Sequence, residues 1–212
     1  MSPLAERYRA IGSALPQGVE LLAVSKGRPA AMVRELYGLG QRRFGESRLQ
    51  EAVAKQQELA DLPGIEWHFI GRLQANKVRP VLQAFPIIQA VDSLPLAQRI
   101  SRIAAELNLC PQLYLQLKLR PDANKGGFER AELEQHWEVL QALPSLQWHG
   151  VMLIPPLALS GEPLQQLFAE VVELANQLQL PGCSMGMSGD WPLAAAHGST
   201  MVRVGGALFG RD

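Results

Sequence analysis

The feature that most constrains this chain is an eightfold alternation of short strand-like runs with segments of helical periodicity. Turn residues separate these segments, and each strand-like run except the last is followed by a candidate helix. The strand-like runs are residues 19–26, 42–46, 66–71, 86–92, 112–119, 147–154, 183–188 and 201–210. The clearest helical patterns are residues 30–40, 47–62, 96–109, 130–143 and 162–180, and another helix is expected over about residues 3–14.

Eight strand–helix units in 212 residues predict one compact (β/α)8 barrel of the TIM type, an α/β fold that occupies residues 1–212 as a single domain. The helix over about residues 3–14 would precede the first strand as an extra element. An open doubly wound sheet also fits the alternation. A Rossmann sheet should carry GxGxxG after its first strand, and this sequence has none there. The pattern therefore favours the barrel.

Composition and charge narrow the class of protein. Hydrophobic residues make up 47% of the chain and charged residues 19%, which is enough to build a core. Twenty basic residues balance twenty acidic ones, so no general basic surface argues for nucleic acid. No apolar run approaches the roughly 20 residues that span a bilayer, and the first residues lack a signal-peptide pattern. Cys110 and Cys183 are too few for a disulfide framework or a zinc site. We expect a cytoplasmic protein without a bound metal or a membrane partner.

Strand parity predicts which side chains enter the barrel. In residues 112–119, Leu113, Leu115, Leu117 and Leu119 share one face, and Tyr114, Gln116 and Lys118 share the other. The leucine face should pack against the outer helices, so the polar face should point into the lumen. The loops that follow the strands open at one end of such a barrel, where function collects.

Lys26 is the first candidate for chemistry. It is one of five lysines, against 15 arginines, and ends the apolar run LLAVSK. We expect it at the barrel mouth with a buried stem. Burial favours the unprotonated amine, which can form a Schiff base with an aldehyde or ketone. The alternative is a lysine that extends from a strand end into solvent.

A cluster of small residues near the carboxyl end is the second candidate. Ser188 is expected to close the seventh strand, and Gly205 and Gly206 to follow inside the eighth. Barrels commonly bind phosphate in the loops after these two strands, where small side chains let backbone N–H groups approach an anion. The same glycines could instead serve tight turns. A lysine on strand one that faces a phosphate cup suggests a phosphorylated aldehyde, and pyridoxal phosphate is the obvious candidate.

Arg203 is the third candidate. If its side chain enters the lumen beside the cup, the guanidinium would face the pyridine nitrogen of the cofactor. Arginine stays protonated, so that nitrogen would remain neutral and accept a hydrogen bond, which restrains carbanion chemistry. The alternative is an arginine that neutralises an aspartate or glutamate inside the barrel.

Seven sequence blocks in register carry a family resemblance. They read LLAVSKGRP, RRFGES, EWHFIGRLQANK, NKGGF, HGVMLIP, CSMGMSGDW and GSTMVRVGGALFG. On these blocks the chain resembles the YggS/PROSC family, the pyridoxal phosphate homeostasis proteins, over nearly its whole length. The resemblance implies a barrel like the N-terminal domain of alanine racemase. It also implies that Lys26 forms the Schiff base, that Arg203 faces the pyridine nitrogen, and that Ser188, Gly205 and Gly206 contact the phosphate.

The sequence departs from the family pattern at several positions. Ser47 stands where the family usually has Asn after FGE, so an amide contact there is in doubt. Gly206 stands where many members have Thr, which removes a hydroxyl from the expected phosphate cup. Lys118 and Asp122 also differ from residues common in the family, so no role is transferred to them.

Three functions from different classes compete. The first is a non-catalytic carrier that buffers or delivers pyridoxal phosphate, expected from the family to be a monomer and to contact cofactor-requiring apoenzymes transiently. The second is an amino-acid racemase, which needs acid/base groups on both faces of the cofactor. The related racemases take one such group from a second domain, and we expect no such domain after residue 212. The third is a cofactor-free aldolase in which Lys26 attacks the substrate, although no proton-relay pair is evident. We favour the carrier, with no catalytic residue.

Overall fold

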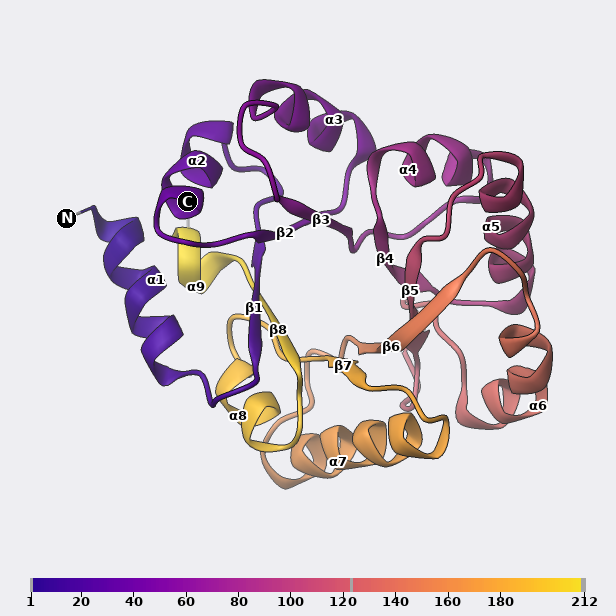
Figure 1. The fold of residues 1–212 in the computed structure, drawn as a ribbon. Helices are drawn as coiled ribbons and strands as arrows, with labels where there is room; N and C mark the ends of the chain where they lie inside the picture. Colours follow the sequence, from indigo (N-terminus) through magenta and orange to yellow (C-terminus); the bar gives the residue numbers. More distant parts are fainter. Residues whose placement is uncertain (1, 123, 211–212) are drawn as a thin grey trace.

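Eight parallel strands close into one barrel (Figure 1). The computed structural model describes residues 2–122 and 124–210. The strands are β1 (Glu20–Val24), β2 (Arg43–Glu46), β3 (Glu66–Phe69), β4 (Ile87–Val91), β5 (Gln112–Leu117), β6 (Gln147–Leu153), β7 (Gly182–Ser184) and β8 (Met201–Val204). The first and last strands pair in parallel, with Leu22 opposite Arg203 and Ala23 opposite Val204. This pairing closes the ring, so the barrel prediction is confirmed and the open sheet is excluded.

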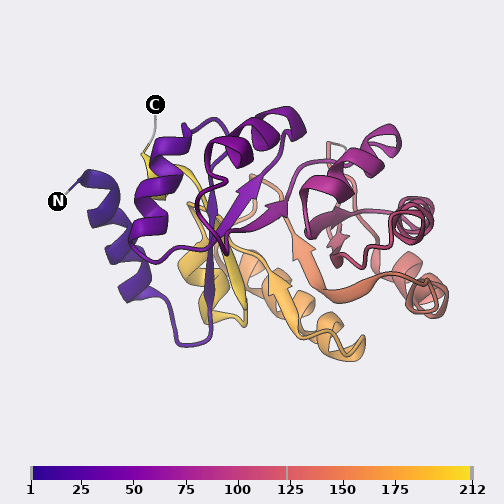
Figure 2. The ribbon, with the colours of Figure 1, turned by 45° about the horizontal axis from the view of Figure 1, so that its top comes forward.

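The helices form a layer outside the strands, as the tilted view in Figure 2 also shows. They are α1 (Pro3–Ala14), α2 (Ala30–Gly38), α3 (Leu49–Glu58), the 3-10 helix η1 (Ala75–Lys77), α4 (Val78–Ala84), α5 (Leu94–Glu106), α6 (Arg130–Gln141), α7 (Gly161–Gln177), α8 (Trp191–Ala196) and α9 (Gly206–Phe209). Helix α1 is the predicted extra element before strand one. The Ser2 hydroxyl caps it by accepting the Ala5 N–H at 3.0 Å.

Helix α5 illustrates why these segments form helices. Its buried apolar residues, Leu96, Ala97, Ile100, Ile103 and Ala104, recur at helical spacing and pack in the main core. This spacing puts them on one face of a helix, toward the sheet, and leaves the charged residues Arg99, Arg102 and Glu106 off that face. Among the residues of the chain that the structure describes, no helix is both long and apolar enough to cross a membrane.

Strand β5 confirms the predicted division between the two faces of the sheet. Leu113, Leu115 and Leu117 belong to the main apolar core. Tyr114 belongs to a separate small cluster with Ile87 and Met152, on strands β4 and β6. The prediction for Lys118 was wrong in one respect, because β5 ends at Leu117. Lys118 therefore lies beyond the strand, at the rim.

The last two strands are shorter than predicted. Strand β7 ends at Ser184, so Ser188 does not close it but lies in the connection to α8. Strand β8 ends at Val204, so Gly205 and Gly206 are not inside it. Gly205 is the residue before α9, and Gly206 is the first residue of that helix. The apolar stretch ALF, which alone suits a strand or a short helix, adopts one helical turn here.

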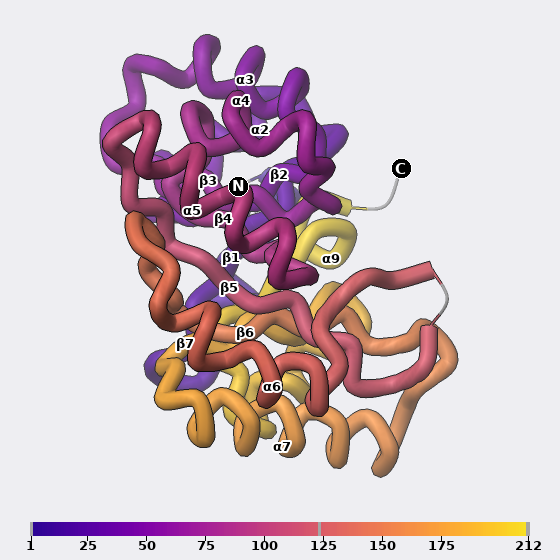
Figure 3. The backbone as a smooth tube through the Cα atoms, turned by 90° about the vertical axis from the view of Figure 1, so that its right-hand side faces the viewer, coloured from indigo at the N-terminus to yellow at the C-terminus, as the bar shows by residue number. Residues whose placement is uncertain are grey.

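All connections that follow a strand lie at the same end of the barrel, because the strands are parallel. Figure 3 shows α9 and the connection after β5 on the same side of the molecule. The candidate residues therefore meet at one mouth, as expected for this fold.

Candidate functional site

The Lys26 side chain projects from a tight turn directly after β1. The Arg28 N–H donates to the Ser25 carbonyl at 3.0 Å, and Gly27 has φ +73°. A four-residue turn with positive φ at its third residue is typical of type II, for which glycine is preferred. Lys26 occupies the second position and is exposed. The prediction of a buried stem was therefore wrong, because Lys26 is exposed in a turn that follows the end of β1 at Val24.

Ser188 and the residues after β8 meet in a small cup. The Ser188 hydroxyl oxygen accepts the Gly205 N–H at 3.3 Å and the Ala207 N–H at 3.2 Å. An ideal Cβ on Gly206 would lie 4.0 Å from the same oxygen. The three residues predicted from the sequence are thus brought together, although in loops rather than in strands. Two N–H groups already directed at one oxygen are donors that suit a phosphate oxygen.

The turn and the cup adjoin each other. Strands β1 and β8 are hydrogen-bonded neighbours, and an ideal Cβ on Gly205 would lie 3.4 Å from the Val24 carbonyl oxygen. The lysine turn therefore lies beside the cup and not across the mouth from it. Lys26 lies two residues after Val24, and it is on the same side of the barrel as Gly205 and Gly206.

Arg203 enters the barrel from β8 and is only 4% exposed. Its guanidinium donates to the Ser184 carbonyl at 2.5 Å, to the Ser184 hydroxyl at 2.9 Å and to the Leu153 carbonyl at 2.7 Å. These acceptors lie on the neighbouring β7 and on β6, so the side chain extends inside the barrel as far as the second strand from β8. Burial lowers the Arg203 pKa to about 10, which leaves the group charged at neutral pH, and Asp190 opposes this shift. The hydrogen bonds go to neutral oxygens rather than to a carboxylate.

A chain of hydrogen bonds continues from Arg203 across the lumen. The Ser184 hydroxyl donates to Gln89 Oε1 at 2.7 Å, and Gln89 Nε2 lies 2.9 Å from His68 Nδ1. Gln89 is on β4 and Ser184 on β7, which are not neighbours in the sheet, so this bond passes through the interior.

Arg203 sets the direction of every bond in this chain. A guanidinium can only donate, so the Ser184 hydroxyl must use its proton on Gln89, and the Gln89 amide must donate to His68. His68 Nδ1 is therefore the acceptor, and its ring is neutral with the proton on Nε2. Desolvation lowers the His68 pKa to about 3, and the positive charge of Arg43 lowers it further. Buried Nε2 has no hydrogen-bond partner among the described residues 2–122 and 124–210.

Sequence reasoning did not identify Gln89 and Ser184 as part of this network. Both are completely buried polar residues. Gln89 does leave a signal, because it is the single polar residue in the strand IIQAV. The sequence alone cannot show that it faces Ser184, since that requires the closure of the ring.

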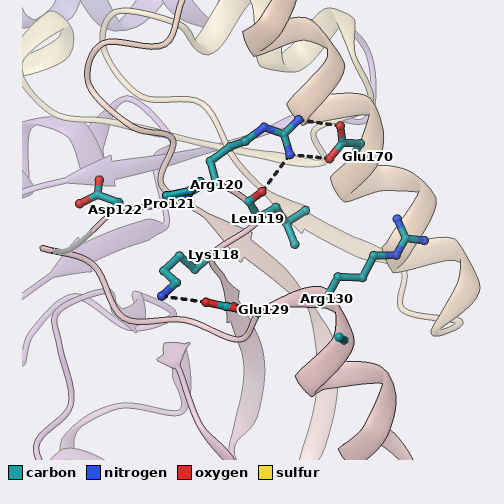
Figure 4. A pocket seen from close by; sticks show the side chains of 9 residues that line it. Lys118, Leu119, Arg120, Pro121, Asp122, Glu129, Arg130 and Glu170 are labelled. Atoms are coloured by element: carbon teal, nitrogen blue, oxygen red, sulfur yellow. Dashed lines mark hydrogen bonds and ion pairs between the residues drawn. The ribbon is translucent and has the colours of Figure 1, made fainter.

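A separate hollow at the rim is lined by none of the residues of the Lys26 turn or the cup. It measures about 510 Å³, and its lining comes from the connection after β5 and from α6 and α7 (Figure 4). Lys118 pairs with Glu129 at 3.2 Å, and Arg120 pairs with Glu170 at 2.6 Å. Because these cations are already paired with carboxylates, the hollow is a poorer phosphate site than the cup.

Comparison with known proteins identifies relatives along the whole chain. Residues 1–212 match the family described as "Alanine racemase, N-terminal domain". The pyridoxal phosphate homeostasis protein of Synechocystis sp. is 47% identical, with 96% of each chain covered. The protein of the same name from Pseudomonas aeruginosa is 44% identical and covers 92% of this chain and 85% of its own.

Solved structures agree with the sequence matches. PipY of Synechococcus elongatus PCC7942, solved with pyridoxal phosphate bound, has a TM-score of 0.93 and is 48% identical, covering 98% of this chain and 100% of its own. An alanine racemase from Clostridium difficile has a TM-score of 0.79 at 18% identity and shares the fold, covering 99% of this chain and 56% of its own. By its sequence and its barrel, this chain belongs to the family of pyridoxal phosphate homeostasis proteins.

Proposed function

We propose that this protein binds pyridoxal phosphate and takes part in its intracellular homeostasis, buffering or delivering the cofactor. The observation that carries the proposal is the meeting of the Lys26 turn with the cup formed by Ser188, Gly205 and Gly206. A relative with 48% identity has been solved with this cofactor bound, which supports the same assignment here.

The residues present fit the cofactor. The cup offers the Gly205 and Ala207 N–H groups and the Ser188 hydroxyl to a phosphate, and the adjoining turn offers the Lys26 amine. When bound, pyridoxal phosphate supplies an aldehyde, whose carbon would take the Lys26 nitrogen as a Schiff base with loss of one water. The exposed position of Lys26 leaves its amine accessible to a cofactor that arrives from solvent.

Arg203 is the residue we assign to the pyridine nitrogen. Its guanidinium is fixed by three neutral oxygens and still has N–H donors left for a further acceptor. A charged donor keeps an aromatic nitrogen unprotonated, which makes the ring a weaker electron sink. This arrangement favours holding the cofactor over reactions at a substrate carbanion.

A racemase is the alternative function, and the tyrosines do not favour it. Tyr8 and Tyr37 lie on the outer helices α1 and α2. Tyr114 is buried in the small lumen cluster, and desolvation raises its pKa, so it stays protonated. None of the three is placed on the Lys26 turn or the cup as an opposing base. We propose a carrier without strong turnover, in which residues 1–212 act as one binding domain, as a cytoplasmic monomer that contacts apoenzymes transiently.

An absorption spectrum of the purified protein tests the proposal. Wild type reconstituted with pyridoxal phosphate should show a band that borohydride bleaches, with the label on Lys26 by peptide mass spectrometry. Lys26→Ala should lose this band, whereas Lys77→Ala, which alters an exposed lysine on η1, should keep it. A colourless wild type that cannot be reconstituted would favour the aldolase. Chiral analysis after incubation with alanine separates carrier from racemase, and robust turnover would overturn the carrier.

A further inference from the structure

Three charged side chains that have no place in the proposed cofactor site gather beneath the Lys26 turn. Glu46 is the last residue of β2 and is completely buried, and Lys55 on α3 is 4% exposed. Lys55 Nζ lies 2.6 Å from Glu46 Oε1 and 3.1 Å from Glu51 Oε1, one helical turn away on α3. A buried ion pair contributes little net stability by itself, so stability alone does not explain why these charged residues are buried here.

These side chains hold the turn on both sides of Lys26. Before it, the Ser25 hydroxyl donates to Glu46 Oε1 at 2.7 Å, and the Ser25 carbonyl accepts from Lys55 Nζ at 2.8 Å. After it, the Gly27 N–H donates to Glu51 Oε1. The contacts therefore reach the backbone of the residue on each side of Lys26, while the Lys26 side chain stays exposed.

Lys55 is a structural cation rather than a second nucleophile. An ammonium has three N–H donors, and Ser25, Glu46 and Glu51 each accept one. The amine is buried and surrounded by these three oxygens at 2.6 to 3.1 Å, so it is not free to attack an aldehyde. Of the two amines near this turn, Lys55 therefore has a structural role, and Lys26 remains the one available to an aldehyde.

We propose that Glu46, Glu51 and Lys55 are positioning residues that fix the turn, so that the Lys26 amine is presented beside the cup. The proposal rests on the proposed function. Its physical basis is preorganisation: a turn held at both ends loses less freedom when the amine reacts. The phosphate cup itself makes none of these contacts and should bind independently of them.

Glu51 provides the best test, because it is only partly buried and its loss leaves the Lys55–Glu46 pair intact. The matched control is Glu58→Ala, which changes an exposed glutamate on the same helix. Glu51→Ala should speed amide hydrogen exchange of Gly27, followed by NMR, by about tenfold. It should slow the appearance of the borohydride-reducible band by a similar factor. Pyridoxine 5′-phosphate lacks the aldehyde, so it should bind to Glu51→Ala with the same affinity as to the wild type.

The conservative variant sharpens the result. Glu51→Gln retains an oxygen acceptor for the Gly27 N–H, so it should recover most of the exchange protection and of the capture rate. Unchanged Gly27 exchange or an unchanged capture rate in Glu51→Ala would overturn the positioning role while leaving the proposed function intact. A wild-type protein that forms no reducible band at Lys26 would overturn the proposed function and the positioning role with it.

Discussion

The neutral, buried ring of His68 predicts that acid weakens the fold as the pH falls below about 6.5. The imidazole pKa lies at about 3 in the folded protein, against 6.5 in an unfolded chain, because burial disfavours the charged ring. Below pH 6.5 the imidazole binds a proton in the unfolded chain but stays neutral in the folded protein. Stability is therefore fully present above pH 6.5 and is lost as the pH falls toward 3.

The magnitude follows from the two pKa values. Each pH unit below the unfolded value costs up to about 1.4 kcal/mol, so between about pH 7 and pH 5 the loss is roughly 2 kcal/mol. We expect urea titrations at a series of pH values to give this slope for wild type. His68→Asn keeps an acceptor for the Gln89 amide but cannot gain a proton. It should lower stability near pH 7, because asparagine is smaller, yet its stability should lack the slope.

The control is His136→Gln, on the outer helix α6, which should retain the wild-type slope. The comparison uses the change with pH rather than the stability at one pH, so a cavity left by asparagine does not affect it. A His68→Asn protein with the same slope as wild type would refute the assignment of a neutral ring, and with it the directed hydrogen bonds that lead from Arg203.

The remaining predictions concern the cup, the arginine and the barrel wall. Arg203→Gln should leave the barrel folded but weaken cofactor binding by about tenfold and shift its absorption band in a spectrophotometric titration; an unchanged spectrum and affinity would remove it from the site. Gly205→Val should lose the cofactor, because a branched side chain would occupy the cup. Its unfolding free energy should fall by only roughly 1 kcal/mol, because an ideal Cβ at this position lies no closer than 3.4 Å to any atom beyond its chain neighbours. Gly206→Thr adds the missing hydroxyl, so cofactor should dissociate several-fold more slowly on dilution, and faster release would contradict this. Gly150→Ala would place a Cβ 2.2 Å from the Gly182 carbonyl oxygen, so calorimetry should show a fall in melting temperature for a loss of about 3 kcal/mol; an unchanged midpoint would refute the clash.

Sequence patterns predicted the barrel because alternation of apolar strands and amphipathic helices repeats along the whole chain. The two periods, about 2 and 3.6 residues, are local properties that survive without a structure. Residues 3–14 were predicted as a helix and form α1 with these bounds. The ends of β7 and β8 were not predictable in this way, because short runs rich in glycine and small residues fit a strand, a loop or a helical turn equally well.

The candidate site was harder to predict than the fold. The types of residue near the mouth were visible, so Lys26, Ser188 and Gly205 could be singled out from sequence. The exposure of Lys26 was not visible, because it depends on a turn that starts after Val24 and is held by residues of β2 and α3. The network through Gln89 was also hidden, since it joins strands that meet only across the closed ring.

The seam between β1 and β8 has a consequence for how such a protein matures. Arg7 donates to the carbonyls of Leu208 and Phe209 at 2.6 and 3.0 Å, and Arg28 donates to that of Gly210 at 2.8 Å, so the beginning of the chain is tied directly to its end. If Lys26 and the cup act as proposed, the amine leaves the ribosome well before the residues of the cup. A partly synthesised chain would then carry the amine without the cup beside it, and it would capture the cofactor only once β8 has joined β1.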